Sequence, residues 1–302
     1  MSGPVWLPLA YRMGPEPEVL GQALERLERL DAPAGACVVL PEYLAYTRDA
    51  SRAALAALSE AARRLGLNLI TTLNLVPEEV GGRLPGAEPG AAYNTLVVVT
   101  RHGELHTPQA KVTVQSFEQR HYDPRFAEIG VRPYRRLHRV RLRPPGGEEP
   151  LTALFLICSD VYLPLLSVAD PEVLRAQVAV IPGNFGRGAE RAVREVLAAF
   201  RGPLWQETVF VNAYQEERPG RPPVARRVEE VRAAQGTPGP LPDAFARMRL
   251  FRRNTVVYPD EVAPNFVRMA ELTDRDGGRF SIPMSVLDLE PVVDEYPWTI
   301  QL

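Results

Sequence analysis

An apolar run that ends at a cysteine is the feature that most constrains the fold of this chain. Residues 151–158 read Leu-Thr-Ala-Leu-Phe-Leu-Ile-Cys, and Ser159 and Asp160 follow at once. An apolar segment of this length, closed by a turn, predicts a strand buried on both faces of a sheet. Folds of the α/β class place reactive groups where such strands end. Cys158 is therefore either a nucleophile or a small buried hydrophobe, since free cysteine is often buried.

Lys111 favours the first interpretation. It is the only lysine in the chain, and all other long cationic side chains are arginines. The compact ammonium of a lysine can occupy a narrow cavity that a planar guanidinium cannot, whereas surface charge is served equally well by either residue. A single lysine in so arginine-rich a sequence is a candidate for chemistry, and the alternative is a chance position on the surface.

Composition limits the class of protein. The 302 residues, 45% of them hydrophobic, are enough for a large buried core. A net charge of −2 gives no reason to expect a nucleic acid or an anionic membrane as partner. No segment approaches the ~20 apolar residues of a membrane span, and the first residues do not resemble a signal peptide. With only two cysteines, we expect a cytoplasmic protein without a disulfide framework.

Hydrophobic periodicity predicts alternating strands and helices, with strand pairs late in the chain. The predicted strands cover 5–11, 36–40, 67–75, 94–100, 104–112, 134–142, 151–157, 178–181, 208–214, 254–258, 266–272 and 280–289. The predicted helices cover 17–30, 51–65, 163–175 and 189–200. Residues 215–250, rich in proline, arginine and glutamate, break the pattern and are expected to be a loop or lid inserted in a single domain spanning 1–302. This order favours a mixed α/β sandwich over a Rossmann domain.

Three motifs at predicted strand ends resemble the signatures of a known family. They are Val-Val-Leu-Pro-Glu at 38–42, Asn-Thr-Leu at 94–96 leading to Lys-Val at 111–112, and Leu-Ile-Cys-Ser-Asp at 156–160. In order and spacing they resemble the signatures of the nitrilase, or carbon–nitrogen hydrolase, superfamily. The resemblance continues at 180–185, 205–211 and 256–260 and leaves only 215–250 unmatched.

The resemblance implies a four-layer α-β-β-α sandwich, often dimerised through a helical face, so we expect a homo-oligomer, a dimer or higher. The family's catalytic triad carries over to Glu42, Lys111 and Cys158, and no metal or cofactor is expected. A second glutamate that holds the lysine is implied as well; Glu118 is the candidate and Glu128 its rival. The implied substrate is a small amide, N-carbamoyl compound or nitrile, with an amide or N-carbamoyl compound expected over a nitrile.

The chemistry of these residue types supports the implied roles. A thiolate is the effective form of a cysteine nucleophile, and Glu42 can take the thiol proton and return it to the leaving nitrogen. Lys111, helped by the backbone N–H of Ser159, can stabilise the negative charge that builds on the attacked group. Water activated by Glu42 would then hydrolyse the thioester. Asp160 is expected to cap the following helix rather than to react.

Candidates for the substrate pocket are the residues expected beside the triad, namely Tyr43, Tyr162, Asn184, Phe185 and Arg187. Tyr43 stands where smaller or aliphatic residues are frequent in the family. The glycine-rich stretch at 183–188 lacks the lysine of a phosphate-binding loop, so a pocket-lining turn is the better interpretation.

Other functions remain as alternatives. His102 and His106 have the spacing of helical zinc ligands, but Gly103 between them favours a hairpin turn. A papain-like hydrolase needs a histidine that normally follows its cysteine, and all four histidines precede Cys158. A non-catalytic binding protein on the same fold and a soluble acyl-transferring member of the family both stay open.

Overall fold

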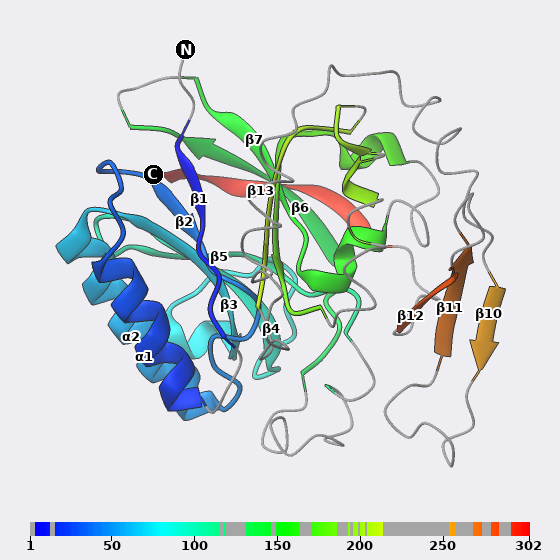
Figure 1. The fold of residues 1–302 in the computed structure, drawn as a ribbon, viewed down its shortest axis with the longest axis horizontal. Helices are drawn as coiled ribbons and strands as arrows, with labels where there is room; N and C mark the ends of the chain where they lie inside the picture. Colours follow the sequence, from blue (N-terminus) through cyan, green and yellow to red (C-terminus); the bar gives the residue numbers. More distant parts are fainter. Residues whose placement is uncertain are drawn as a thin grey trace, which may run out of the picture.

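The computed structural model describes two mixed five-stranded sheets and two long helices (Figure 1), so the predicted mixed α/β class is confirmed. The residues described are 4–12, 16–114, 118, 131–145, 149–163, 171–185, 193, 196–198, 200–202, 204–213 and 291–302, with the strands at 254–257, 268–273 and 279–283. Residues 215–250, predicted to be an insertion, lie outside them, and the single domain predicted over 1–302 stays a prediction.

The first sheet has the strand order β1-β2-β3-β4-β5. Its first three strands pair in parallel and its last two are antiparallel to their neighbours. The strands are β1 (Trp6–Pro8), β2 (Cys37–Val39), β3 (Asn68–Leu75), β4 (Tyr93–Val99) and β5 (Leu105–Ala110). Each falls within one residue of a predicted strand or inside it.

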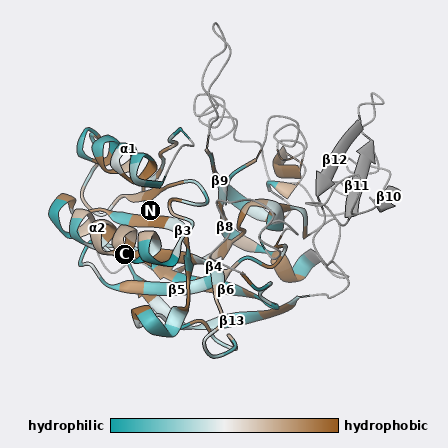
Figure 2. Ribbon diagram, turned by 90° about the horizontal axis from the view of Figure 1, so that it is seen from below, coloured by the Kyte–Doolittle hydropathy of each residue, from teal (hydrophilic) through white to brown (hydrophobic). Residues whose placement is uncertain are grey.

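Two helices cover one face of this sheet, α1 (Glu16–Glu28) and α2 (Arg48–Leu65) (Figures 1 and 2). Helix α2 begins after Thr47, whose hydroxyl accepts the N–H of Ala50 at 3.3 Å, and ends at Gly66, which has φ of 67°. Both ends follow ordinary capping chemistry. The Glu16 carboxylate accepts the backbone N–H of Thr47 at 2.6 Å and so joins the start of α1 to the start of α2.

Alternating residues of the first sheet pack into two different apolar layers. Val38, Leu69 and Val97 contact the helices, in a cluster that includes Leu27 and Leu58. The intervening residues, among them Val39, Ile70, Leu96 and Val98, belong to a cluster that contains the second sheet. Side chains on a strand alternate between its faces, so the first sheet is buried between the helices and the second sheet.

The second sheet has the order β13-β6-β7-β8-β9. Its strands are β6 (Arg136–Arg143), β7 (Leu151–Phe155), β8 (Ala176–Gly183), β9 (Trp205–Asn212) and β13 (Val292–Gln301). β7, β8 and β9 are parallel, so their carboxyl ends meet at one edge. Strand β13 was not predicted: it is an edge strand with irregular exposure and a register shift between Glu295 and Thr299. Its sequence therefore lacks a clean period of two.

The helix predicted at 163–175 is described only at its two ends, since residues 164–170 lie outside the described residues. Leu163 is helical, as predicted, whereas Pro171–Leu174 form the 3₁₀ helix η4, so the prediction is wrong there. Another 3₁₀ helix, η3 (Cys158–Tyr162), comes just before this segment. The helix predicted at 189–200 lies mostly outside the described residues, although Val193, Leu197 and Phe200 are helical and buried. For that reason the fourth layer of the expected sandwich is left as a prediction.

Three further strands, β10 (Asn254–Val257), β11 (Arg268–Thr273) and β12 (Arg279–Pro283), form a separate antiparallel sheet. All three overlap predicted strands. In the part of the chain that the structure describes, no helix is long and apolar enough to cross a membrane.

Candidate active site

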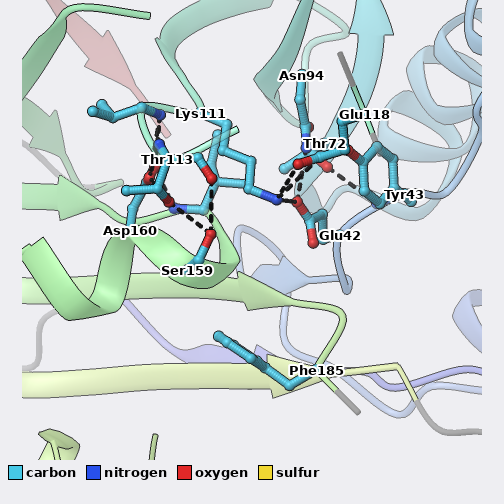
Figure 3. Close-up of polar contacts among 12 residues, drawn as sticks. Glu42, Tyr43, Thr72, Asn94, Lys111, Thr113, Glu118, Ser159, Asp160 and Phe185 are labelled. Atoms are coloured by element: carbon cyan, nitrogen blue, oxygen red, sulfur yellow. Dashed lines mark hydrogen bonds and ion pairs between the residues drawn. The ribbon is translucent and has the colours of Figure 1, made fainter. Parts of the chain in front are cut away.

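The residues that follow β2, β5 and β7 meet at one place between the two sheets. The Nζ atom of Lys111 lies 2.7 Å from Oε1 of Glu42, and 3.1 and 3.2 Å from the two carboxylate oxygens of Glu118 (Figure 3). The thiol of Cys158 lies near enough to the Glu42 carboxylate and the Lys111 ammonium for both groups to shift its pKa. Each of these side chains is at least nine-tenths buried.

Glu42 is held through the backbone on either side of it. The Tyr11 hydroxyl donates to the carbonyl oxygens of Pro41 and Glu42 at 3.2 and 3.4 Å. The N–H of Glu42 donates to the carbonyl of Gly183 at the end of β8, at 3.3 Å, which ties the first sheet to the second. Tyr43 adopts a φ of 64°, a left-handed conformation that is costly for a residue with a side chain, and its N–H donates to Thr72 Oγ1 at 3.1 Å.

Asn94 was not predicted as a site residue, yet it contacts Glu42 directly. Its Nδ2 donates to Oε1 of Glu42 at 2.7 Å, the same oxygen that accepts the Lys111 ammonium (Figure 3). The carbonyl of Asn94 also accepts the backbone N–H of Lys111 at 2.9 Å. A fully buried amide near the start of an otherwise apolar strand is the signal that could have identified this residue.

Lys111 is enclosed by opposite charge. Burial lowers the pKa of Lys111, but the negative charges of Glu42 and of a Cys158 thiolate raise it by a larger amount. The net effect is a raised pKa, so the lysine stays an ammonium. The ring of Tyr43 lies 5.7 Å from Nζ and adds a cation–π contact. Glu118 therefore occupies the place predicted for the second glutamate; Glu128, its rival, lies outside the described residues.

Cys158 occupies a strained turn at the end of β7. Its φ is 51°, and it is the first residue of η3. Burial raises the pKa of the thiol well above its ordinary value and the Glu42 charge raises it further, while Lys111 and the backbone N–H of Asn184 act in the opposite direction. Cys158 is consequently a thiol beside a carboxylate, an arrangement in which the carboxylate can accept the thiol proton.

Asp160 does more than the helix capping predicted for it. It does accept the N–H of Ile157, at 3.3 Å, as a cap would. Its shorter hydrogen bonds go to the segment after Lys111, from the N–H of Thr113 at 2.8 Å, the hydroxyl of Thr113 at 2.7 Å and the N–H of Val112 at 3.1 Å. Nothing in the local sequence around Asp160 indicates partners so far away in the chain.

Ser159 joins the same two segments. Its hydroxyl donates to the carbonyl of Thr113 at 3.0 Å and lies 2.6 Å from the Thr113 hydroxyl (Figure 3).

Aromatic side chains adjoin the site. The Asn212 side chain binds both backbone polar groups of Phe185. It accepts the Phe185 N–H at 2.7 Å and donates to the Phe185 carbonyl at 3.0 Å. The Phe185 ring packs edge-on against Tyr162 and Phe210, with centroid distances of 6.1 and 5.9 Å. Tyr162 also lies in the field of Cys158, which places this pair near the nucleophile. Arg187, the remaining pocket candidate, lies outside the described residues.

The histidine pair belongs to a hairpin. β4 and β5 are antiparallel neighbours, and Gly103 between them has φ of 80°, as the predicted turn requires. Among the residues that the structure describes, no group of three or more histidine, cysteine, aspartate or glutamate side chains is arranged to hold a metal ion.

Comparison with models of known protein families gives no match for this chain, and comparison with curated proteins gives none either. Among solved structures it is similar to an amidase from Nesterenkonia sp., with 18% identity over 70% of this chain and 76% of that one and a TM-score of 0.47. It is also similar to a carbon–nitrogen hydrolase from Helicobacter pylori G27, with 15% identity over 71% and 74% of the two chains and a TM-score of 0.49. Likenesses this distant carry no argument about activity. The solved structures that this chain resembles include an amidase from the nitrilase superfamily, the family that its sequence resembles.

Proposed function

We propose that this protein is a carbon–nitrogen hydrolase that cleaves a non-peptide amide or N-carbamoyl bond through a thioester on Cys158. The observation that carries the proposal is a buried ammonium, Lys111, held between Glu42 and Glu118, with the Cys158 thiol beside Glu42. A buried ion pair is weak evidence for stability, because the desolvation of the charges offsets their attraction. A three-charge cluster beside a thiol is better explained by chemistry.

In the first step the Cys158 sulfur attacks the substrate carbonyl carbon and its proton passes to Glu42. Oε1 of Glu42 already accepts hydrogen bonds from Lys111 and Asn94, which leaves Oε2 as the oxygen that takes the proton. The negative charge that forms on the substrate oxygen is stabilised by the Lys111 ammonium and by the backbone N–H of Ser159. Fixed charges in a water-poor site act strongly because they need not reorganise during the reaction.

In the second step the tetrahedral intermediate collapses and the carbon–nitrogen bond breaks. Glu42 returns its proton to the leaving nitrogen, which departs as ammonia or an amine, and the acyl group remains on Cys158 as a thioester. A water molecule enters, Glu42 takes its proton, and its oxygen attacks the thioester carbon. The products are a carboxylic acid and the regenerated thiol.

Three alternatives have defined tests. An acyl-transferring enzyme would pass the thioester to an amine or hydroxyl rather than to water. A nitrilase would accept a carbon–nitrogen triple bond, and the same triad serves for both. A non-catalytic binding protein would show none of these reactions.

We favour an amide or N-carbamoyl substrate. We also propose that the protein is cytoplasmic and is a homo-oligomer of two or more subunits. Light scattering on the purified protein would test the oligomeric state.

The deciding experiment is a screen of primary amides, N-carbamoyl compounds and nitriles for ammonia release, with Cys158→Ala and Cys37→Ala as a matched pair. Both cysteines are buried and free, but only Cys158 adjoins Glu42. The proposal predicts release that Cys158→Ala abolishes and Cys37→Ala retains. Release that persists in Cys158→Ala, or no release from any member of the panel, would contradict it.

A further inference from the structure

One buried carboxylate joins the lysine-bearing and cysteine-bearing segments of the site. Asp160 is fully buried and accepts hydrogen bonds from the N–H groups of Val112, Thr113 and Ile157 and from the Thr113 hydroxyl. Val112 and Thr113 lie 48 and 47 residues away in the sequence. Figure 3 shows Asp160, Ser159 and Thr113 together on one side of Lys111, with Glu42 and Glu118 on the other.

The partners of Asp160 are the immediate neighbours of the reacting groups. Val112 directly follows Lys111, and Ile157 directly precedes Cys158. A carboxylate bonded to both fixes the position of one backbone segment relative to the other. A helix cap would need only the bond to Ile157, which is the longest of the set at 3.3 Å.

Four donors around one carboxyl group require an ionised acceptor. An amide at this position would turn an NH₂ group toward at least one backbone N–H, and a neutral carboxyl would do the same with its proton. Burial raises the pKa of Asp160 to about 6, against the hydrogen bonds from Thr113 and Val112 and the charge of Lys111, which favour the ionised form. Asp160 is therefore mainly a carboxylate at neutral pH.

We propose that Asp160 is a positioning residue for the reaction, whose carboxylate sets the distance between the Lys111 ammonium and the Cys158 sulfur and holds Cys158 in its left-handed conformation. This inference rests on the proposed function, since it assumes that Cys158 and Lys111 react as a unit. Asp160 contacts neither the substrate nor the reacting atoms; it acts through the two segments that carry them. Misplacement of a catalytic group by about 1 Å can cost about 10²-fold in rate.

The test uses Asp160→Asn and the pair Thr113→Val and Thr113→Ser. Asp160→Asn keeps the shape of the side chain, removes its charge and turns an NH₂ group toward at least one of the four donors. Thr113→Val removes the hydroxyl that donates to Asp160 and contacts Ser159, and Thr113→Ser retains it. Asn68→Ala is the control: Asn68 is equally buried and bonds the backbone at Gly35 and Arg101, away from the site. For every variant kcat, KM, the thermal midpoint and the rate of Cys158 alkylation by iodoacetamide are measured.

We expect Asp160→Asn to lower kcat by about 10²-fold with little change in KM, and to slow alkylation of Cys158 in folded protein. Thr113→Val should lower kcat and the Cys158 alkylation rate by less, and Thr113→Ser should change them hardly at all. Asn68→Ala should lower the thermal midpoint and leave the alkylation rate of Cys158 unchanged. In the double variant of Asp160→Asn with Thr113→Val, the Thr113 change should add little, because the two side chains act through one bond.

Wild-type kcat and alkylation in folded Asp160→Asn would overturn the inference. So would equal effects of Thr113→Val and Thr113→Ser, a result that remains available if Asp160→Asn does not fold. The alkylation rate needs no substrate, so a protein that hydrolyses no amide can still confirm or refute the role of Asp160. Conversely, amide turnover that is insensitive to these variants would reject the role of Asp160 and leave the proposed function intact.

Discussion

Lys111 contacts two carboxylates and lies near one thiol. Its ammonium is 98% buried and lies within 3.2 Å of both Glu42 and Glu118. One ammonium and two carboxylates carry a net charge of −1 when Cys158 is a neutral thiol. Removing one member of such a buried cluster typically costs about 3–5 kcal/mol, because the remaining charges lose their partner. Substitutions that retain the charge are thus the informative ones.

Lys111→Arg should fold and yet lose nearly all turnover. The guanidinium keeps the charge but is larger and planar, and it would extend into the space where the substrate oxygen must lie. Loss of one donor to a developing charge costs about 10²–10³ in kcat, or about 3–4 kcal/mol. Steady-state kinetics together with a thermal melt would measure both. Wild-type turnover in Lys111→Arg would mean that the single lysine is an accident of composition.

Asn94→Leu should lower kcat about tenfold without unfolding the protein. Leucine has nearly the shape of asparagine but cannot donate to Oε1 of Glu42, so the carboxylate loses one of the two bonds that orient it. Asn68→Leu, on the neighbouring strand β3, removes a buried amide that bonds the backbone at Gly35 and Arg101, away from Glu42. If both leucine variants reduce kcat equally, the effect comes from general destabilisation and Asn94 has no special role.

Iodoacetamide should modify Cys158 in preference to Cys37. Cys37 lies within β2, fully buried, and burial raises its pKa to about 12. Cys158 is also buried but lies beside Glu42, a carboxylate that can take its proton. Peptide mapping after partial labelling would distinguish the two thiols. Faster modification of Cys37 would count against the proposed mechanism.

At the scale of elements, the contact between β5 and β6 joins the two sheets through buried polar side chains. Gln109 on β5 accepts the N–H of His138 on β6 at 2.9 Å and donates to the carbonyl of Arg136 at 2.9 Å. The Nδ1 atom of His138 lies 2.7 Å from the carbonyl of Pro108. Burial lowers the pKa of His138 below its ordinary 6.5, although the Pro108 carbonyl opposes this shift.

This contact predicts a loss of stability at acid pH. The folded protein resists protonation of His138, whereas the unfolded chain accepts the proton near pH 6.5. The contribution of His138 is therefore complete above pH 6.5 and is lost as the pH falls below that value. Urea denaturation at several pH values should give a shallower pH dependence for His138→Gln than for wild type. His102→Gln, at an exposed turn, should keep the wild-type slope; identical slopes in all three proteins would refute the assignment.

Elements with strong apolar patterns could be predicted from the sequence, and those defined by pairing could not. Strand β7 is a buried apolar run, and Cys158 follows its end, as the sequence predicts. Strand β13 is held by its parallel pairing with β6 rather than by an apolar period, so its own sequence gives no strand signal. Of the helix predicted at 163–175, Leu163 is helical and Pro171–Leu174 form the 3₁₀ helix η4.

At the scale of the whole molecule, the site exists because two sheets bring strand ends together. Glu42 and Lys111 follow strands of the first sheet and Cys158 follows a strand of the second, and the bond from Glu42 N–H to Gly183 crosses between them. That Glu42, Lys111 and Cys158 lie together could be predicted, because each belongs to a recognisable motif at the end of a predicted strand. The roles of Asn94 and Asp160 could not, because they depend on contacts between segments about 50 residues apart, which a local pattern does not encode.

The central claim is that Cys158 forms a covalent thioester, and intact-protein mass spectrometry tests it most directly. The protein is mixed with an amide that releases ammonia, quenched in acid within milliseconds to seconds, and weighed. We predict a mass increase equal to the acyl group of the substrate minus one hydrogen, mapped to the peptide of Cys158, present in Cys37→Ala and absent in Cys158→Ala. An adduct on Cys37, or ammonia release at the wild-type rate by Cys158→Ala, would contradict the account.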